Sequence, residues 1–390
     1  MIDSIFIAMS GLRGHQRGLD VISHNVANMN TPGFKGSSVD FADVFGGEPG
    51  GDDPGASAGG GLDASRTTLD LRAGELQRTG RDLDLALEGE GYFVFREASG
   101  ALRYGRGGGV EFDAAGRLVG RGHGLEVMAR QADGTLAPLR LDGLRSSAPK
   151  ATHEIRLSGN LSSTAGEHAI DPLPVYDRLG GLHNLRLAFT RDAGGGFERW
   201  TVHASEAGRE LDAARLEFVG GRPLGGASTL RLSLGLAQAE AIDVDLVFGS
   251  EATSFSSGTT STLAVEGQDG RAAGTISGLR FDPTGRLEIA YSNGQSAEGA
   301  QLALAGLRDA AAVRPVGDGL FAYGGAESVA LRTAGEDLRV AGQSLELSNV
   351  DLTREFGALI LMQRGYQASS QVIGTANEML QQLFELGSRR

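Results

Sequence analysis

The sequence predicts an α+β, multidomain protein, with N- and C-terminal helices pairing as a coiled-coil-like domain. The middle is predicted to form β-rich domains of barrel or sandwich type, one inserted in the other. Apolar residues recur every three or four positions at both ends of the chain. Between these ends the sequence is rich in glycine and shows the period of two that is typical of strands. A length of 390 residues leaves room for two or three domains.

The first helix is predicted over residues 2–26. Its apolar stripe consists of residues that stand seven apart, with two companions at the other seam position: Ile5, Leu12, Leu19 and Val26, with Ala8 and Ile22. The helical pattern ends at residues 28–33, Asn-Met-Asn-Thr-Pro-Gly. Asparagine competes for backbone hydrogen bonds, proline lacks a donor and glycine has free φ, so a helix stops there.

The second helix is predicted over residues 352–386. Its stripe repeats the same spacing: Leu352, Leu359, Tyr366, Ile373 and Leu380, with Met362, Ala376 and Leu383 at the other seam position. A seven-residue repeat keeps one stripe of a helix facing a partner. Such a stripe also occurs on helices that merely cover a core. Small and amide residues such as Gln16, Gln363 and Ser370 favour packing between subunits.

The middle of the chain is predicted to contain a linker and two β-rich domains. Residues 46–65 have the glycine-rich composition of a flexible linker. Residues 92–95, Tyr-Phe-Val-Phe, are apolar on both faces and predict a central strand. The predicted parts are a helical domain (1–40 and 345–390), a linker (41–65), a β-rich domain (66–147 and 262–344) and an inserted outer β-rich domain (148–261).

Charge and composition exclude several classes of function. The net charge is −13, of which −12 lies in residues 41–344, so the chain lacks the basic footprint of a nucleic-acid-binding protein. No apolar run reaches the length of a membrane span, and residues 1–4 lack the basic start of a secretory signal. There is no cysteine, which excludes disulfides and thiolate metal sites.

The candidate catalytic and metal-binding motifs lack the features that such sites require. Residues 55–59, Gly-Ala-Ser-Ala-Gly, match a nucleophile elbow, but they lie in the linker and lack the strand and helix that expose such a serine. The seven histidines show no metal-ligand spacing, and Asp52 and Asp53 lack the alternating ligands of a calcium loop. We therefore predict a protein that is not an enzyme, with no catalytic residue, no cofactor and no bound metal.

The terminal helices are not expected to fold alone. Burying one apolar seam gains less free energy than ordering both ends of the chain costs. We expect these ends to be disordered in the monomer and to become ordered on assembly.

Three segments resemble the flagellar rod and hook proteins. They are Ser-His-Asn-Val-Ala-Asn-Met-Asn-Thr-Pro-Gly-Phe-Lys at 23–35, Thr-Gly-Arg-Asp-Leu-Asp-Leu-Ala-Leu-Glu-Gly-Glu-Gly-Tyr-Phe at 79–93, and Leu-Glu-Leu-Ser-Asn-Val-Asp-Leu at 345–352 followed by Met-Gln-Arg-Gly-Tyr-Gln-Ala at 362–368. The segment at 39–45 and the insertion at 148–261 resemble hook subunits more than rod subunits. One departure is Gly365, where the family usually has alanine before the tyrosine.

The resemblance implies a structural subunit of the hook, a tubular helical polymer outside the cell that acts as a flexible joint between motor and filament. It implies self-assembly, export through the flagellar type III apparatus, and contacts with the hook cap, the distal rod and the hook–filament junction proteins, without nucleic acid or membrane insertion. The predicted polymerisation interface is Ile5, Leu12, Leu19, Val26, Asn25, Asn28, Leu352, Leu359, Met362, Tyr366, Ile373, Leu380 and Leu383. The alternatives are a rigid rod subunit and, from another class, an exported β-rich hydrolase.

Overall fold

The computed structural model describes residues 2–43, 61–192, 198–224, 228–237, 239–325, 329–335 and 337–388. For residues 2, 228 and 383–388 it describes the backbone only. The chain divides into two compact units. Unit 1 comprises residues 1–142, 279–288 and 298–390, and unit 2 comprises residues 143–278 and 289–297.

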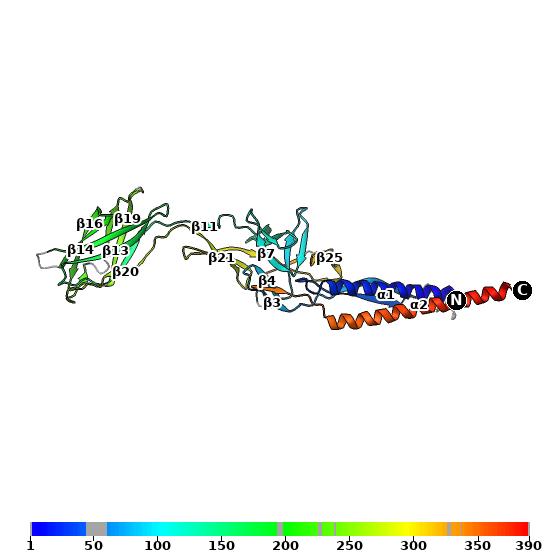
Figure 1. The fold of residues 1–390 in the computed structure, drawn as a ribbon. Coiled ribbons are helices and arrows are strands. Elements are labelled where there is room, and N and C mark those ends of the chain that lie inside the picture. The colour runs from blue at the N-terminus through cyan, green and yellow to red at the C-terminus, as the bar shows by residue number, and fades with distance from the viewer. Residues whose placement is uncertain are drawn as a thin grey trace. The chain divides into compact units, whose positions relative to one another are not determined.

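Both terminal helices belong to unit 1 and pack against each other. Helix α1 spans Ile2–Ala27 and helix α2 spans Leu352–Ser388. They run antiparallel, since Gly11 of α1 lies by Ser369 and Gly18 lies by Met362. Figure 1 shows the two helices, blue and red, side by side. In the part of the chain described, neither helix has a stretch long and apolar enough to cross a membrane.

A β-hairpin accompanies the helices. Strand β1 (Ser37–Asp43) pairs antiparallel with β2 (Leu62–Leu69), from Ser37 opposite Leu69 to Asp43 opposite Leu62. The two ends of the predicted linker at 41–65 therefore lie in paired strands. Strand β1 begins before the linker, and alternating residues such as Val39 and Phe41 favour its extended backbone. The rest of that linker, residues 44–60, lies outside the described residues.

The β part of unit 1 is built from short antiparallel strands. Their bounds are β3 Leu76–Arg78, β4 Asp84–Gly89, β5 Tyr92–Arg96, β6 Leu102–Gly105, β7 Gly108–Phe112, β8 Leu118–Gly120, β9 Glu126–Arg130, β10 Leu136–Pro138, β24 Leu304–Gly306, β25 Val313–Gly317, β26 Leu320–Tyr323, β27 Ala330–Arg332, β28 Leu338–Gly342 and β29 Ser344–Glu346, with a 3-10 turn at Ala310–Ala312. Strand β5 pairs with β6, β9 and β24. The prediction of a central strand at 92–95 is therefore confirmed.

Strand β29 ends at Glu346, shortly before α2 begins at Leu352, and it pairs with β3. The neighbouring β28 pairs with β4, which in turn pairs with β7. The start of the C-terminal helix is thereby attached to the β part of unit 1 through its preceding strand. Three further strands have residues in both units: β21 Gly274–Phe281, β22 Arg286–Tyr291 and β23 Ser296–Leu302.

Unit 2 contains a two-sheet sandwich. One sheet has the order β18-β19-β12-β20 and the other the order β13-β14-β15-β16-β17. The bounds are β11 Ser146–Ser147, β12 Glu154–Asn160, β13 Glu167–Tyr176, β14 Leu182–Arg191, β15 Glu198–Glu206, β16 Arg209–Val219, β17 Arg222–Pro223, β18 Ser228–Leu234, β19 Ile242–Thr253 and β20 Ala264–Gln268. Inward residues of both sheets form one core around Trp200, in which the rings of Phe189 and Phe248 meet edge to face with centroids 6.5 Å apart.

The α+β prediction, with paired terminal helices and β-rich domains, is confirmed. The sandwich core extends from Ile155 to Leu263, close to the predicted inserted domain at 148–261. The compact unit that holds it is wider, because it also takes in residues 143–147, 262–278 and 289–297. The bounds of the four predicted parts stay a proposal.

A half-buried histidine, His183, gives unit 2 a pH-dependent contribution to stability. His183 Nδ1 lies 2.7 Å from Glu206 and Nε2 lies 3.4 Å from Asp177. Burial lowers the pKa of His183, but the hydrogen bonds to these two carboxylates outweigh burial and raise it above its usual value. The stabilisation is therefore complete below the unfolded pKa, about 6.5, and is lost as the pH rises through the folded pKa.

We expect His183→Asn to lower the free energy of unfolding by about 1–3 kcal/mol at pH 6, and by less at pH 8.5. Fluorescence of Trp200, the only tryptophan and fully buried in unit 2, follows this transition. The exposed His153→Asn is the control. An equal loss for His183→Asn at both pH values would contradict the assignment.

Candidate functional site

The two terminal helices approach closely because α1 carries glycines where its neighbours press against it. A Cβ on Gly18 would lie 2.7 Å from Met362 Sδ, and a Cβ on Gly14 would lie 2.7 Å from Leu62 Cδ2. Real Cβ atoms do not come so near other side chains. These glycines therefore create the depressions in which α2 and the β1–β2 hairpin sit.

Gly365, the departure from the family pattern, has a similar explanation. A Cβ at this position would lie 2.4 Å from His15 Cε1. The imidazole of His15 also packs against Phe41, with ring centroids 5.9 Å apart. The ring of His15 thus occupies the space that an alanine methyl group would need.

Most of the predicted polymerisation residues lie half-buried along the helix pair. These are Ile5, Leu12, Leu19, Val26, Leu352, Leu359, Met362, Ile373 and Leu380. Their companions Ala8, Ile22 and Ala376 are buried, with exposed fractions of 6%, 6% and 8%. Tyr366 is exposed, and the side chain of Leu383 lies outside the described residues. The seam is thus most deeply buried within the subunit at Ala8, Ile22 and Ala376, whereas the companion Met362 is half-buried.

The two predicted asparagines make hydrogen bonds within the chain. Asn25 is buried; its Nδ2 donates to Ser37 O at 2.7 Å and its Oδ1 accepts from Ser37 N at 3.0 Å. The Asn25 amide bonds to Ser37 as the backbone of a neighbouring strand would, and it thereby connects α1 to the start of β1. Asn28 Nδ2 donates to His24 O at 2.9 Å, and its Oδ1 accepts from Thr31. His24 O also accepts from Asn28 N at 3.2 Å, so the Asn28 side chain adds a second donor to this carbonyl in the last turn of α1.

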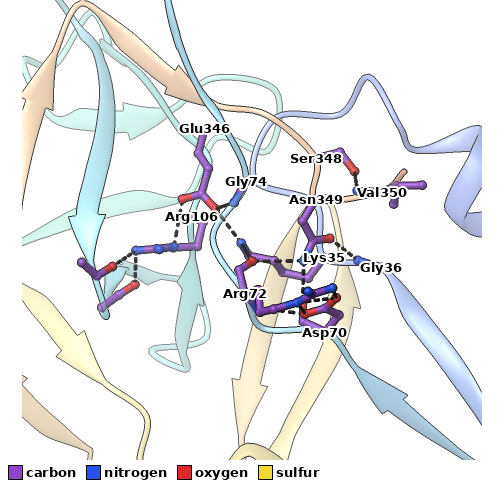
Figure 2. Close-up of polar contacts among 12 residues, drawn as sticks. Lys35, Gly36, Asp70, Arg72, Gly74, Arg106, Glu346, Ser348, Asn349 and Val350 are labelled. Carbon is purple, nitrogen blue, oxygen red and sulfur yellow. Dashed lines mark hydrogen bonds and ion pairs between the residues drawn. The ribbon is translucent and has the colours of Figure 1, made fainter. Parts of the chain in front are cut away.

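A buried ionic cluster joins the three recognised segments. Lys35 Nζ lies 2.5 Å from Glu346 Oε1, and Arg106 Nε lies 2.9 Å from Glu346 Oε2. The side chains of Lys35 and Glu346 are fully buried, and that of Arg106 is 4% exposed. Figure 2 shows Lys35 and Arg106 converging on the Glu346 carboxylate from two sides.

Backbone groups complete this cluster. Lys35 Nζ also donates to Arg72 O at 2.6 Å, and Gly74 N donates to Glu346 Oε1 at 2.9 Å. Arg106 Nη1 donates to Gly89 O and Gly91 O, each at 2.9 Å. The contact of Arg106 Nε with Oε2 is an ion pair without hydrogen-bond geometry. Each of the three charges thus has at least two partners.

A second set of hydrogen bonds holds the strand-to-helix connection before α2. Asn349 Oδ1 accepts from Gly36 N at 2.9 Å, while its Nδ2 donates to Asp70 O at 2.8 Å and Arg72 O at 3.0 Å. One amide therefore contacts the segments on both sides of the β1–β2 hairpin. Asp70 and Arg72 also form an ion pair with each other (Figure 2).

Burial dominates the electrostatics of the cluster. It lowers the pKa of Lys35 from its usual value, although the hydrogen bond to Glu346 acts in the opposite direction. Burial also raises the pKa of Tyr92, whose ring lies 5.8 Å from the Arg106 guanidinium carbon. Among the described residues no group of three or more histidine or carboxylate side chains could hold a metal ion. The arrangement connects segments of the chain, with the side chains of Lys35 and Glu346 fully buried.

Lys35 and Glu346 lie within the segments that resemble the family, but no role was predicted for them. Arg106 was not predicted at all. A signal was present. Lys35 is one of only two lysines, and Glu346 interrupts the apolar residues Leu345 and Leu347. A lone charge in an apolar strand needs a buried partner.

Comparison with known proteins agrees with this geometry. Residues 5–35 match the family model "Flagella basal body rod protein", and residues 341–386 match "Flagellar basal body rod FlgEFG protein C-terminal". The flagellar hook protein FlgE of Treponema pallidum is 29% identical, over 99% of this chain and 100% of its own. The FlgE of Salmonella typhimurium is 28% identical, over 97% and 98%. The chain belongs to the flagellar rod and hook protein family.

A crystal structure of Helicobacter pylori FlgE2 covers 63% of this chain and 93% of its own, at 11% identity and a TM-score of 0.42. The near full-length relatives are hook proteins, which favours the hook over the rod. The predictions of a structural hook subunit outside the cell surface and of a non-enzyme are confirmed by these relatives.

We expect Lys35→Met to lower the free energy of unfolding of unit 1 by about 3 kcal/mol, because it removes one partner from a buried carboxylate. Hydrogen exchange of the buried backbone amides of β5, a strand of unit 1, measures this loss without requiring ordered terminal helices. Arg280→Met is the control within unit 1, since Arg280 is 76% exposed in its ion pair with Glu288 and its loss is expected to cost at most about 1 kcal/mol. Equal losses for the two variants would rule out a structural role for the buried cluster.

Proposed function

We propose that this chain assembles with copies of itself into the tubular hook through its terminal helices. One observation carries the proposal: the helix pair exposes large apolar side chains. They are Phe6, Ile7, Met9, Phe356, Ile360, Leu361, Val372 and Met379, with exposed fractions between 38% and 66%. Groups of exposed large apolar side chains mark sites of interaction between proteins. Neighbouring subunits would cover it.

The half-buried seam residues also belong to this proposal. Side chains such as those of Leu359 and Ile373 pack partly against neighbouring elements and are partly exposed to solvent. In a polymer the open part would meet the next subunit. The ends of the chain support close packing, because residues 1–40 have no net charge and residues 345–390 have a net charge of −1. The acidic remainder keeps a polymer soluble.

The specific partners are proposed from the family. Export through the flagellar type III apparatus, growth beneath a hook cap, and contacts with the distal rod and the hook–filament junction proteins follow from a place in the hook. The role as a flexible joint that transmits torque follows in the same way. A cysteine-free chain suits export in an unfolded state.

Immunogold electron microscopy of isolated flagella, with antibody against residues 148–261, tests the proposal. Label along the curved segment between the outer membrane and the filament supports the hook. Label confined to the straight shaft within the envelope would make the chain a rod subunit. Absence of flagellar label would reopen the hydrolase alternative.

Leu359→Asp or Ile373→Asp is expected to abolish polymerisation, because a carboxylate at a packed helix surface loses its hydration without gaining a partner. Electron microscopy of hooks from a complemented hook-deficient strain measures assembly, and Trp200 fluorescence verifies that unit 2 stays folded. Leu179→Asp is the matched control, since Leu179 is 89% exposed and lies in unit 2 rather than on the terminal helices. Normal hooks from the Leu359 and Ile373 variants would refute this interface.

A further inference from the structure

A groove of about 600 Å³ runs between α1, α2 and the edge of the β1–β2 hairpin. Ser4, Ser369 and the carboxylate of Asp43 line part of it. The rest of its lining is small or apolar: Ile7, Ala8, Gly11, Gly61, Leu62, Ala368 and Val372. Ala8 is buried, whereas Ile7 and Val372 at the rim are 41% and 48% exposed. The groove therefore has room for large side chains against a mainly small and apolar lining, with one carboxylate, that of Asp43.

A second apolar surface of α2 projects outward. Phe356 and Ile360 are four residues apart, so they share one helix face, and they are 53% and 51% exposed. The groove residues Ala368 and Val372 have the same spacing twelve residues later. At 100° per residue, the two faces are turned by about 120° around the helix axis. They are distinct surfaces of one helix, one convex and one hollow.

Symmetry decides how two such surfaces are used. A closed dimer brings the same patch of two subunits together, whereas an open helical polymer needs two different and complementary patches. A projecting face and a groove on one helix meet that requirement. Phe356 and Ile360 have the same spacing as Ala368 and Val372. A parallel copy of the subunit shifted by twelve residues, about 18 Å along α2, therefore places Phe356 level with Ala368 and Ile360 level with Val372.

We propose that the Phe356–Ile360 face of one subunit docks into the groove beside Ala368 and Val372 of the next subunit. The inference rests on the proposed self-assembly and adds to it the mating surfaces and their register. The occupant of the groove is a second copy of this chain. The small residues Ala8, Gly11 and Ala368 make the space for its phenylalanine ring.

Engineered disulfides test the register, since the chain has no cysteine of its own. The variant carries Ile360→Cys with Val372→Cys and is expressed in a hook-deficient strain. These positions lie about 18 Å apart on one helix, too far for a bridge within a subunit. We expect mild oxidation of isolated hooks to give a ladder of covalent oligomers on non-reducing gels.

Matched controls separate the register from random collisions. Each single cysteine variant, and the off-register pair Ile360→Cys with Met379→Cys, is expected to give no ladder. Should the first pair fail to assemble, Phe356→Cys with Ala368→Cys probes the same register. Assembled hooks of either register pair without a ladder would overturn the docking but leave self-assembly intact. Absence of hooks even with the unaltered chain would overturn the proposed function itself.

Discussion

The buried ionic cluster of Lys35, Arg106 and Glu346 is the interaction on which the rest of unit 1 depends. Its three side chains come from the end of the N-terminal segment, from the loop before β7 and from the strand before α2. Removing ions from water is costly, and the cost is offset only when every partner is in place. The cluster therefore forms when all three segments have met, and it fixes where both terminal helices leave the β part.

Helix packing follows from that anchor. Once Asn25 is bonded to Ser37 and Asn349 to Gly36, the end of α1 and the start of α2 lie at a fixed distance from each other. The glycines of α1 then allow the close approach that a larger residue would prevent. The hydrogen bonds of Asn25 and Asn349 set the register of the two helices, and the glycines of α1 permit their close contact. Neither would suffice alone, because a seam of apolar side chains can slide along its axis.

The distribution of apolar surface on the helices fits the proposed assembly, in which they contact each other and neighbouring subunits. The companions Ala8, Ile22 and Ala376 are covered within the subunit, whereas Phe356, Ile360 and Leu361 remain open. A single stripe cannot serve an intramolecular partner and several neighbours at once, since each contact needs its own face. The helix pair of a polymer subunit therefore carries more apolar faces than the seam of a two-stranded coiled coil.

The sequence by itself determined the paired terminal helices and the β-rich middle, because helix and strand periodicity are local properties that each segment carries. It also determined the family, through three segments in the right order. Tertiary structure alone decided that Lys35 and Arg106 meet at Glu346, since these residues are far apart in the chain. Tertiary structure likewise decided which apolar residues are open, because residues 100° apart on a helix differ in burial only by what packs against them. The seven-residue repeat located the interior seam, and exposure in the folded subunit located the outer faces.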